Sequence, residues 1–213
     1  MGLFISFEGG EGCGKSTQAK KLATELDQQG YSVTLTYEPG GTPLGEELRR
    51  SLKRARDEGI TAEAEMMLFA AARSQLTMTV LIPALEQDRV VVCDRYADST
   101  TAYQGYGRGL PLATVAAVNR VATRGILPDL TVLLDMDPSR ALLRKGRTRD
   151  RFEHESAAFH ERVRNGYLAL AQAEPARWLV LDASQPPATT AQAIWSRVSA
   201  LLDRSLTLKH PPA

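Results

Sequence analysis

Residues 9–17 constrain this chain more than any other stretch, because they fit the pattern Gly-x4-Gly-Lys-Ser/Thr directly after a short apolar run at residues 3–7. Glycines in such a loop let successive backbone N–H groups turn toward one anion, and the helix that follows adds the positive end of its dipole. The lysine is placed to contact the β- and γ-phosphates, and the hydroxyl to bind Mg²⁺. The predicted nucleotide-binding residues are Gly9, Gly10, Glu11, Gly12, Cys13, Gly14, Lys15, Ser16 and Thr17.

Strand-like and helix-like segments alternate along the 213 residues, which is the pattern of a parallel sheet with helices on both faces. Strands are expected at residues 3–7, 31–37, 90–93, 130–134 and 178–181. Helices are expected at residues 43–53, 62–85, 98–104, 112–123 and 153–173, as well as after the glycine-rich loop and near the C-terminus as far as residue 202. A flexible segment is expected at 105–109 and a frayed tail after 204. The sequence therefore predicts a single α/β domain over residues 1–213 with a five-stranded parallel sheet.

Charge and composition limit the partners of the chain. Its 26 Lys and Arg residues nearly balance its 25 Asp and Glu residues, so no overall field draws it to nucleic acid or to a membrane. We see no apolar run of membrane-spanning length and no secretion signal, and we expect a cytoplasmic protein. The two cysteines and three histidines show no metal-ligand spacing.

Asp94 and Arg95 follow a β-branched run that reads as a buried central strand. In open α/β sheets the ligand crevice lies at the carboxyl ends of the strands, so these two charges are expected beside the phosphate loop. The alternative is a surface salt bridge at a strand end. An acidic and a basic residue at this place suit Mg-nucleotide chemistry. We predict Ser16 and Asp94 as metal ligands, and Lys15, Asp94 and Arg95 as catalytic residues.

Residues 144–151 are the most charged stretch, with five positive charges and one negative charge. Such a run is usually a solvated face. Phosphoryl transfer, however, requires positive charge around the migrating group, and a short mobile lid at about residues 144–153 would supply it from the same chain. The candidate catalytic residues in this lid are Arg147, Arg149 and Arg151.

Four segments of the chain resemble the thymidylate kinase family, and the resemblance covers nearly the whole sequence. They are residues 7–17, the run Glu38-Pro39-Gly40-Gly41-Thr42, the run Asp94-Arg95-Tyr96 with Ser99, Thr100, Tyr103 and Gln104 behind it, and the basic segment that leads into Asp150-Arg151-Phe152-Glu153. Adenylate and related nucleotide kinases share the loop and the sheet, but are expected to carry a Gly-Pro-Gly type loop. The resemblance implies a P-loop nucleoside monophosphate kinase-like fold and a homodimer.

The resemblance also implies an activity, which is transfer of the γ-phosphate of ATP to thymidine 5′-monophosphate (dTMP) with Mg²⁺. Phe69 would stack on the thymine, Arg73 would hydrogen-bond the base, Arg95 would hold the acceptor phosphate and Glu11 would receive the 3′-hydroxyl. Glu38, Ser99, Thr100, Tyr103 and Gln104 would complete the substrate site. From the residues alone, Phe69 and Tyr103 are equally well explained by packing, and Arg73 by a helix surface.

The chain departs from the family pattern at two places. Tyr37 stands where bacterial members commonly have an arginine before Glu-Pro-Gly-Gly-Thr, and residues 12–13 lack the arginine that one branch carries. The charge missing from the phosphate loop is expected from the lid, whereas Tyr37 leaves the acceptor phosphate without one cation that the family can supply. Two alternatives remain, a kinase for another nucleoside or nucleotide and a P-loop NTPase without an acceptor pocket. Phe69, Arg73 and Gln104 argue against the second.

Overall fold

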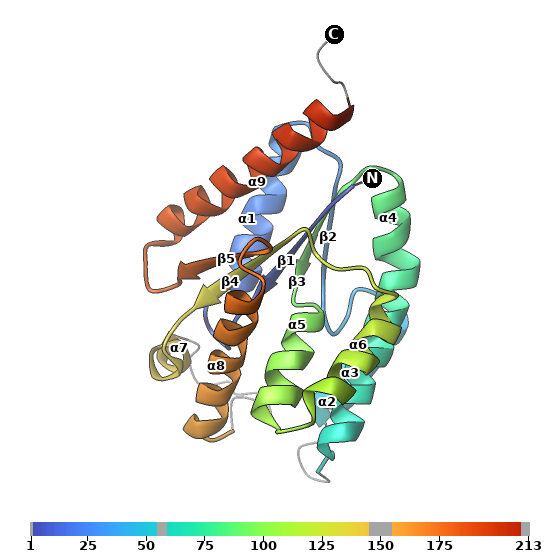
Figure 1. The fold of residues 1–213 in the computed structure, drawn as a ribbon, viewed down its shortest axis with the longest axis vertical. Helices are drawn as coiled ribbons and strands as arrows, with labels where there is room; N and C mark the ends of the chain where they lie inside the picture. Colours follow the sequence, from blue (N-terminus) through green and yellow to red (C-terminus); the bar gives the residue numbers. More distant parts are fainter. Residues whose placement is uncertain (1, 55–58, 145–154, 210–213) are drawn as a thin grey trace.

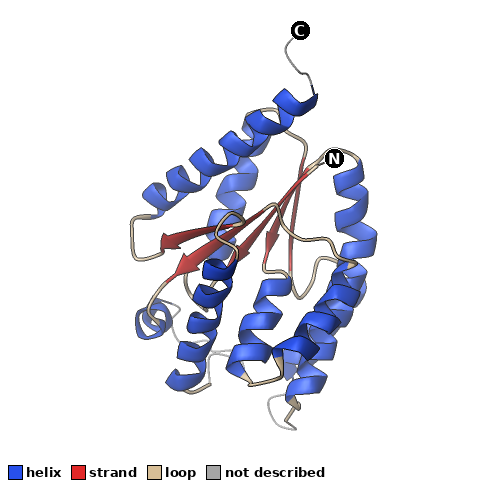
Figure 2. Ribbon diagram, viewed as in Figure 1, coloured by secondary structure: helices blue, strands red, loops and turns tan. Residues whose placement is uncertain are grey.

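The computed structural model describes residues 2–54, 59–144 and 155–209, and places five strands in one sheet. All four strand pairings are parallel, and the strand order is β2-β3-β1-β4-β5 (Figure 2). The strands are β1 (Leu3–Glu8), β2 (Val33–Tyr37), β3 (Val90–Asp94), β4 (Leu130–Asp135) and β5 (Trp178–Asp182). The predicted five-stranded parallel sheet is confirmed.

Strand β1 lies at the centre of the sheet, with strands and helices on every side, and all six of its residues are therefore buried. The strands on either side, β3 and β4, are nearly continuous apolar runs, as expected for parallel strands covered on both faces. The register pairs Phe7 with Asp94 on one side and with Val132 on the other. The carboxyl ends of β1 and β3 therefore meet at the point where the glycine-rich loop begins.

Helices cover both faces of the sheet (Figure 1). On one face, α1 and α9 lie side by side and pack on Ile5, Phe7 and Val92. The other face is covered by the helical segments around residues 81–85, 97–103 and 159–171. The helical elements are α1 (Lys15–Gln28), α2 (Pro43–Arg54), α3 (Ala62–Leu76), η1 (Thr77–Leu81), α4 (Ile82–Glu86), α5 (Ala97–Thr100), η2 (Thr101–Gly107), α6 (Leu112–Thr123), α7 (Pro138–Arg144), α8 (Ala157–Ala173) and α9 (Pro187–Lys209).

Strand β2 begins at Val33, two residues later than predicted, and three helical boundaries also differ from those predicted. The segment 105–109, expected to be flexible, is helical as far as Gly107, where Phe159 and Val163 pack closely against the backbone. Helix α8 begins at Ala157, four residues later than expected, because the side chain of Ser156 caps it by accepting a hydrogen bond from the Phe159 N–H at 3.2 Å. Helix α9 continues to Lys209, past the point at which fraying was expected.

Residues Ala62–Glu86 form one continuous helix that is long and apolar enough to cross a membrane, although we expected no apolar run of that length; core helices can meet the same criterion. Pro83 does not interrupt it, because π-type turns at residues 77–81 precede the proline. The helix carries Glu65 and Arg73, which are 0% and 1% exposed and are paired with other charges of the fold. Since buried ion pairs place it among protein neighbours, we assign it to the core of the domain.

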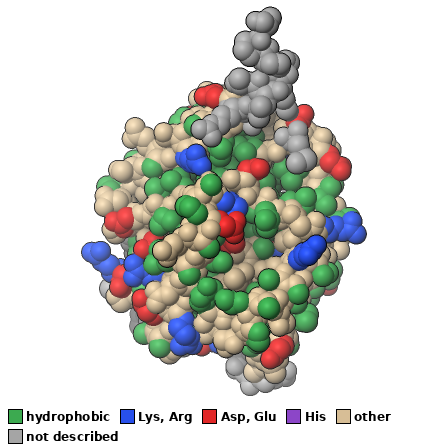
Figure 3. All heavy atoms as spheres, viewed as in Figure 1, with side chains coloured by type: hydrophobic (Ala, Val, Ile, Leu, Met, Phe, Trp, Pro, Cys, Tyr) green, Lys and Arg blue, Asp and Glu red, His purple; other side chains and the backbone are tan. Residues whose placement is uncertain are grey.

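Charges of both signs are interspersed on the face of the molecule shown in Figure 3. Blue and red side chains are scattered among uncharged atoms, in places next to one another, and no broad area of one sign covers this face. This agrees with the near-zero formal charge of the chain, +1.

Candidate active site

The phosphate loop joins β1 to α1, and two of its positions require glycine. Gly9 has φ 137°, and a Cβ there would lie 2.5 Å from the carbonyl oxygen of Leu134. Gly12 has φ 72°, and a Cβ there would lie 2.3 Å from the carbonyl oxygen of Ala141. Only glycine combines a positive φ with such close backbone neighbours. The loop curves tightly as a result, and the N-terminus of α1 is left open to an anion.

Lys15 begins α1 and reaches back across this loop. Its Nζ donates a hydrogen bond to the carbonyl oxygen of Gly10 at 2.6 Å and lies 3.5 Å from the sulfur of Cys13. The side chain is 7% exposed. Its charge therefore lies over the concave side of the loop, where the phosphates of a nucleotide would be held.

Asp94 ends β3 and contacts Ser16 of α1. The hydroxyl of Ser16 donates to Asp94 Oδ2, while Oδ1 is buried and has no hydrogen-bond partner among the described residues. Hydroxyl and carboxylate oxygens suit Mg²⁺, which is usually bound by one or two protein ligands together with water and substrate phosphates. Within residues 2–54, 59–144 and 155–209 no group of three or more His, Cys, Asp or Glu could hold a metal by itself. The Ser16–Asp94 pair fits the predicted metal site.

Arg95 adopts a positive φ of 73°, which is uncommon for a residue with a side chain and turns its guanidinium under the phosphate loop. Its Nη1 donates to the carbonyl oxygen of Gly9 at 3.1 Å, and its Nη2 pairs with Glu11 Oε1 at 2.5 Å. Three hydroxyl oxygens also accept hydrogen bonds from it at 3.2 to 3.3 Å, those of Ser99, Tyr103 and Tyr167.

Glu8 lies behind this arginine and is fully buried. Its carboxylate accepts hydrogen bonds from the Tyr96 N–H at 2.8 Å, the Ser99 hydroxyl at 2.5 Å and the Tyr167 hydroxyl at 3.0 Å. Burial, with a smaller effect of the nearby Asp98, raises the pKa of Glu8 to about 7. Ser99 and Tyr167 therefore join Glu8 to Arg95 in one buried polar network.

One cavity of about 590 Å³ runs from the phosphate loop to the side chains of α3, α5 and η2. Fourteen of the predicted site residues form part of its wall: Glu11, Gly12, Gly14, Lys15, Ser16, Thr17, Glu38, Phe69, Asp94, Arg95, Ser99, Thr100, Tyr103 and Gln104. Gly9, Gly10 and Cys13 lie on the other side of the loop, beside β4 and α8. The structure thus brings together in one space residues that are far apart in the sequence, from Glu11 to Gln104.

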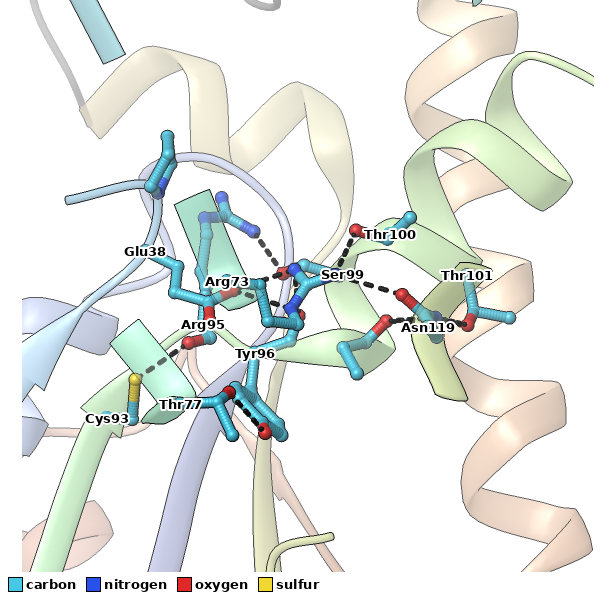
Figure 4. Close-up of polar contacts among 12 residues, drawn as sticks. Glu38, Arg73, Thr77, Cys93, Arg95, Tyr96, Ser99, Thr100, Thr101 and Asn119 are labelled. Atoms are coloured by element: carbon cyan, nitrogen blue, oxygen red, sulfur yellow. Dashed lines mark hydrogen bonds and ion pairs between the residues drawn. The ribbon is translucent and has the colours of Figure 1, made fainter. Parts of the chain in front are cut away.

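Arg73 does not line this cavity but lies behind its wall, 1% exposed (Figure 4). Its Nε and Nη2 pair with Glu38 Oε2 at 2.8 and 2.7 Å, and Nη2 also donates to the carbonyl oxygen of Tyr96 at 3.1 Å. Its Nη1 donates to Thr100 Oγ1 and to Asn119 Oδ1, each at 2.9 Å. Every nitrogen of the guanidinium has a partner within the protein, so the arginine holds the wall residues Glu38 and Thr100 in place.

Comparison with known proteins identifies the family. The sequence matches the family model described as thymidylate kinase over residues 7–194. The chain belongs to the thymidylate kinase family. It is 53% identical over 203 residues to a thymidylate kinase of Dehalococcoides mccartyi, covering 95% of this chain and 98% of that protein, and 48% identical to one of Geotalea uraniireducens, covering 95% and 99%. The crystal structure of thymidylate kinase from Ehrlichia chaffeensis superposes with a TM-score of 0.76 at 32% identity, covering 92% of this chain and 98% of that one.

Tyr37, one of the two departures from the family pattern, has the guanidinium of an arginine beside its ring. The Tyr37 hydroxyl donates to Glu46 Oε1 at 2.6 Å, and the guanidinium of Arg49 lies 5.4 Å from the centre of the Tyr37 ring. Arg49 also donates to the carbonyl oxygen of Pro39 at 2.8 Å and lines the cavity. In this chain, α2 therefore brings a cation close to the position at which the usual arginine is missing.

Five polar residues of the site were not predicted from the sequence. These are Glu8, Arg49, Glu65, Asn119 and Tyr167. Asn119 had a signal, since it interrupts the apolar helix at residues 112–123. The others act through contacts between elements that are distant in sequence, such as the 159 residues between Glu8 and Tyr167. The predicted lid arginines Arg147, Arg149 and Arg151 lie outside the described residues.

Proposed function

We propose that the chain phosphorylates dTMP to the diphosphate with ATP as donor. Its membership of the thymidylate kinase family supports this assignment. The observation that carries it is the continuous cavity, which has phosphate-loop residues at one end and Phe69, Thr100 and Gln104 at the other. A kinase for a small nucleotide needs both ends, whereas an NTPase without an acceptor needs only the first.

At the donor end, the loop backbone and Lys15 bind the phosphates of ATP. Nitrogen donors around an anion stabilise the charge that develops during phosphoryl transfer more than they stabilise the ground state. Ser16 and Asp94 would hold Mg²⁺, which when bound neutralises phosphate charge and aligns the β- and γ-phosphates. The unpaired Asp94 Oδ1 and the adjacent hydroxyl support this placement.

At the acceptor end, Arg95 binds the dTMP phosphate and brings it into line with the phosphoryl group. The two anions repel one another, and a fixed guanidinium between them lowers the cost of bringing them together. Phe69 stacks on the base, and Ser99, Thr100, Tyr103 and Gln104 surround the nucleoside. Arg73 acts on the base pocket through Glu38 and Thr100, the wall residues that it holds.

The test is ADP release measured by a coupled assay with dTMP, dUMP, dCMP, dAMP and dGMP as acceptors. We expect dTMP to be the best acceptor, dUMP to be accepted and the two purine nucleotides to be rejected, because buried polar groups left unpaired penalise the wrong base. Equal activity with a purine nucleotide would favour another nucleotide kinase. ADP release that needs no acceptor would favour an NTPase.

We also propose that the chain forms a homodimer in the cytoplasm and folds as one domain over residues 1–213. Helix α3 packs against both α2 and α6, and the three helices carry the exposed apolar side chains Met67, Leu44 and Val121. An exposed apolar surface of this kind favours association with a second copy. Light scattering during gel filtration tests the dimer, and Val121→Asp is expected to shift it toward monomer.

The lid at about residues 144–153 remains a prediction.

A further inference from the structure

We infer that Glu65 is a specificity-determining positioning residue, which holds the side-chain amide of Gln104 in one orientation and so selects pyrimidines that carry a hydrogen on ring nitrogen N3. This inference rests on the proposed function, because it concerns the base of the acceptor nucleotide. It assigns a role to a residue that does not line the cavity.

Gln104 is the wall residue on which the inference depends. It belongs to η2, lines the cavity and is 1% exposed as a whole. Its Nε2 donates a hydrogen bond to Glu65 Oε1 at 2.8 Å. Its Oε1 accepts no hydrogen bond from the residues that the structure describes. One end of the amide is thus held inside the protein, and the other is available to a ligand.

The chemistry of the partner decides which end is held. The two ends of an amide have nearly the same shape, but one donates and the other accepts. Glu65 is 0% exposed and its carboxylate receives two hydrogen bonds from Arg108, Nε to Oε1 and Nη2 to Oε2, each at 3.1 Å. A carboxylate paired with a guanidinium only accepts, so the amide must turn its nitrogen toward Glu65. The carbonyl oxygen is left for the base.

A carbonyl oxygen distinguishes pyrimidines at N3. Thymine and uracil carry a hydrogen on N3 and donate it to the Gln104 carbonyl oxygen. Cytosine has a lone pair at N3, which repels this oxygen and leaves it without a hydrogen bond. Leaving a buried polar group without its partner reduces binding by about tenfold or more. Glu65, acting through Gln104, would therefore exclude cytosine nucleotides.

The test compares kcat/KM for dUMP and dCMP, which both lack the 5-methyl group and differ only at N3 and at the group on C4. Wild-type enzyme is expected to prefer dUMP. Glutamine at position 65 can either donate or accept, so Glu65→Gln frees the amide of Gln104 to rotate. The ratio of kcat/KM for dUMP to that for dCMP is then expected to fall by about tenfold, mainly through KM. A rotated amide can donate a hydrogen bond to cytosine N3, whereas the wild-type amide only accepts one from uracil N3–H.

Glu155→Gln is the matched control. Glu155 Oε1 pairs with the other side of Arg108, at 2.7 Å from Nη1, so this variant alters the same arginine but leaves the Glu65–Gln104 contact in place. Its dUMP:dCMP ratio is expected to equal that of wild type. A ratio that falls as far in this control as in Glu65→Gln would overturn the inference.

Gln104→Met gives a second test, which remains informative if Glu65→Gln does not fold. It removes the acceptor but keeps the Glu65–Arg108 ion pair, and the dUMP:dCMP ratio is expected to fall as it does in Glu65→Gln. If Gln104→Met keeps the wild-type ratio, or if folded Glu65→Gln loses activity equally with both acceptors, the inference is wrong although the kinase assignment stands. If wild-type enzyme phosphorylates no pyrimidine nucleotide, the proposed function itself fails.

Discussion

The carboxylate of Glu11 and the guanidinium of Arg95 form an ion pair inside the phosphate loop, with Oε1 and Nη2 2.5 Å apart. The hydroxyl of Tyr103 donates to the same oxygen at 3.0 Å. A negative charge in a loop built for anions needs a cation or a donor close by, and these two residues provide both. Glu11 therefore positions the arginine that we propose to hold the acceptor phosphate, in addition to its predicted contact with the 3′-hydroxyl.

A double-mutant cycle separates these two roles of Glu11. An acceptor without the 3′-hydroxyl is expected to lose roughly ten- to a hundredfold in kcat/KM on wild-type enzyme, because a charge-assisted hydrogen bond contributes about 1.5 to 3 kcal/mol. In Glu11→Gln this penalty should shrink. If Glu11 serves only Arg95, the variant will impair both acceptors equally and the coupling energy will be zero. That result would remove the hydroxyl contact and leave the ion pair.

Lys15→Ala is expected to abolish measurable turnover. Its charge lies over the loop, and backbone donors cannot replace a cation on the transferred phosphate, so the loss should be roughly 3 kcal/mol or more in transition-state stabilisation. The measurement is kcat with saturating ATP and dTMP. Lys21→Ala is the control, because Lys21 lies on the same helix, is exposed and does not line the cavity. Near-normal turnover of Lys15→Ala would contradict the phosphate-loop assignment.

Arg49→Ala is expected to raise KM for dTMP about tenfold with a smaller change in kcat. Arg49 lines the cavity beside Tyr37, and a charge-assisted contact with an anionic acceptor is expected to contribute about 1.5 kcal/mol or more. Arg50→Ala is a matched control, since Arg50 is its neighbour, is largely exposed and pairs only loosely with Glu47, at 4.0 Å. If the two variants have the same KM for dTMP, Arg49 does not take the place of the missing arginine.

The sheet and most of the cavity wall could be predicted from the sequence. Both depend on local patterns, namely apolar runs for β1, β3 and β4, the glycine-rich loop motif for Lys15, and the end of strand β3 for Asp94 and Arg95. The sequence did not reveal which partner each buried charge has. Arg73 was expected at the base, but its five N–H groups are used by partners 23 to 46 residues away in the chain. Such pairings depend on how helices pack, which periodicity does not report.

Glu8 provides a prediction about stability and pH. Its pKa is about 7 in the folded protein, whereas the ordinary value for a glutamate, which applies to the unfolded chain, is 4.5. Between these pH values the folded state therefore binds more protons than the unfolded state. The free energy of unfolding therefore falls as pH rises through this window, by about 3 kcal/mol for a shift of this size. Glu8→Gln has no such proton to release, and its unfolding free energy should decline less over the same range.

Urea unfolding at several pH values from 4.5 to 7.5 measures the difference between wild type and Glu8→Gln. Asp137→Asn is the control: hydrogen bonds from Ser139 lower the pKa of the exposed Asp137 below its ordinary value of 3.8. Its contribution to stability is complete above pH 3.8 and is lost only as pH falls further, so this variant should keep the wild-type slope between pH 4.5 and 7. A Glu8→Gln curve parallel to that of wild type across this range would show that Glu8 is already ionised in the folded protein, and that its three hydrogen bonds outweigh the cost of its burial.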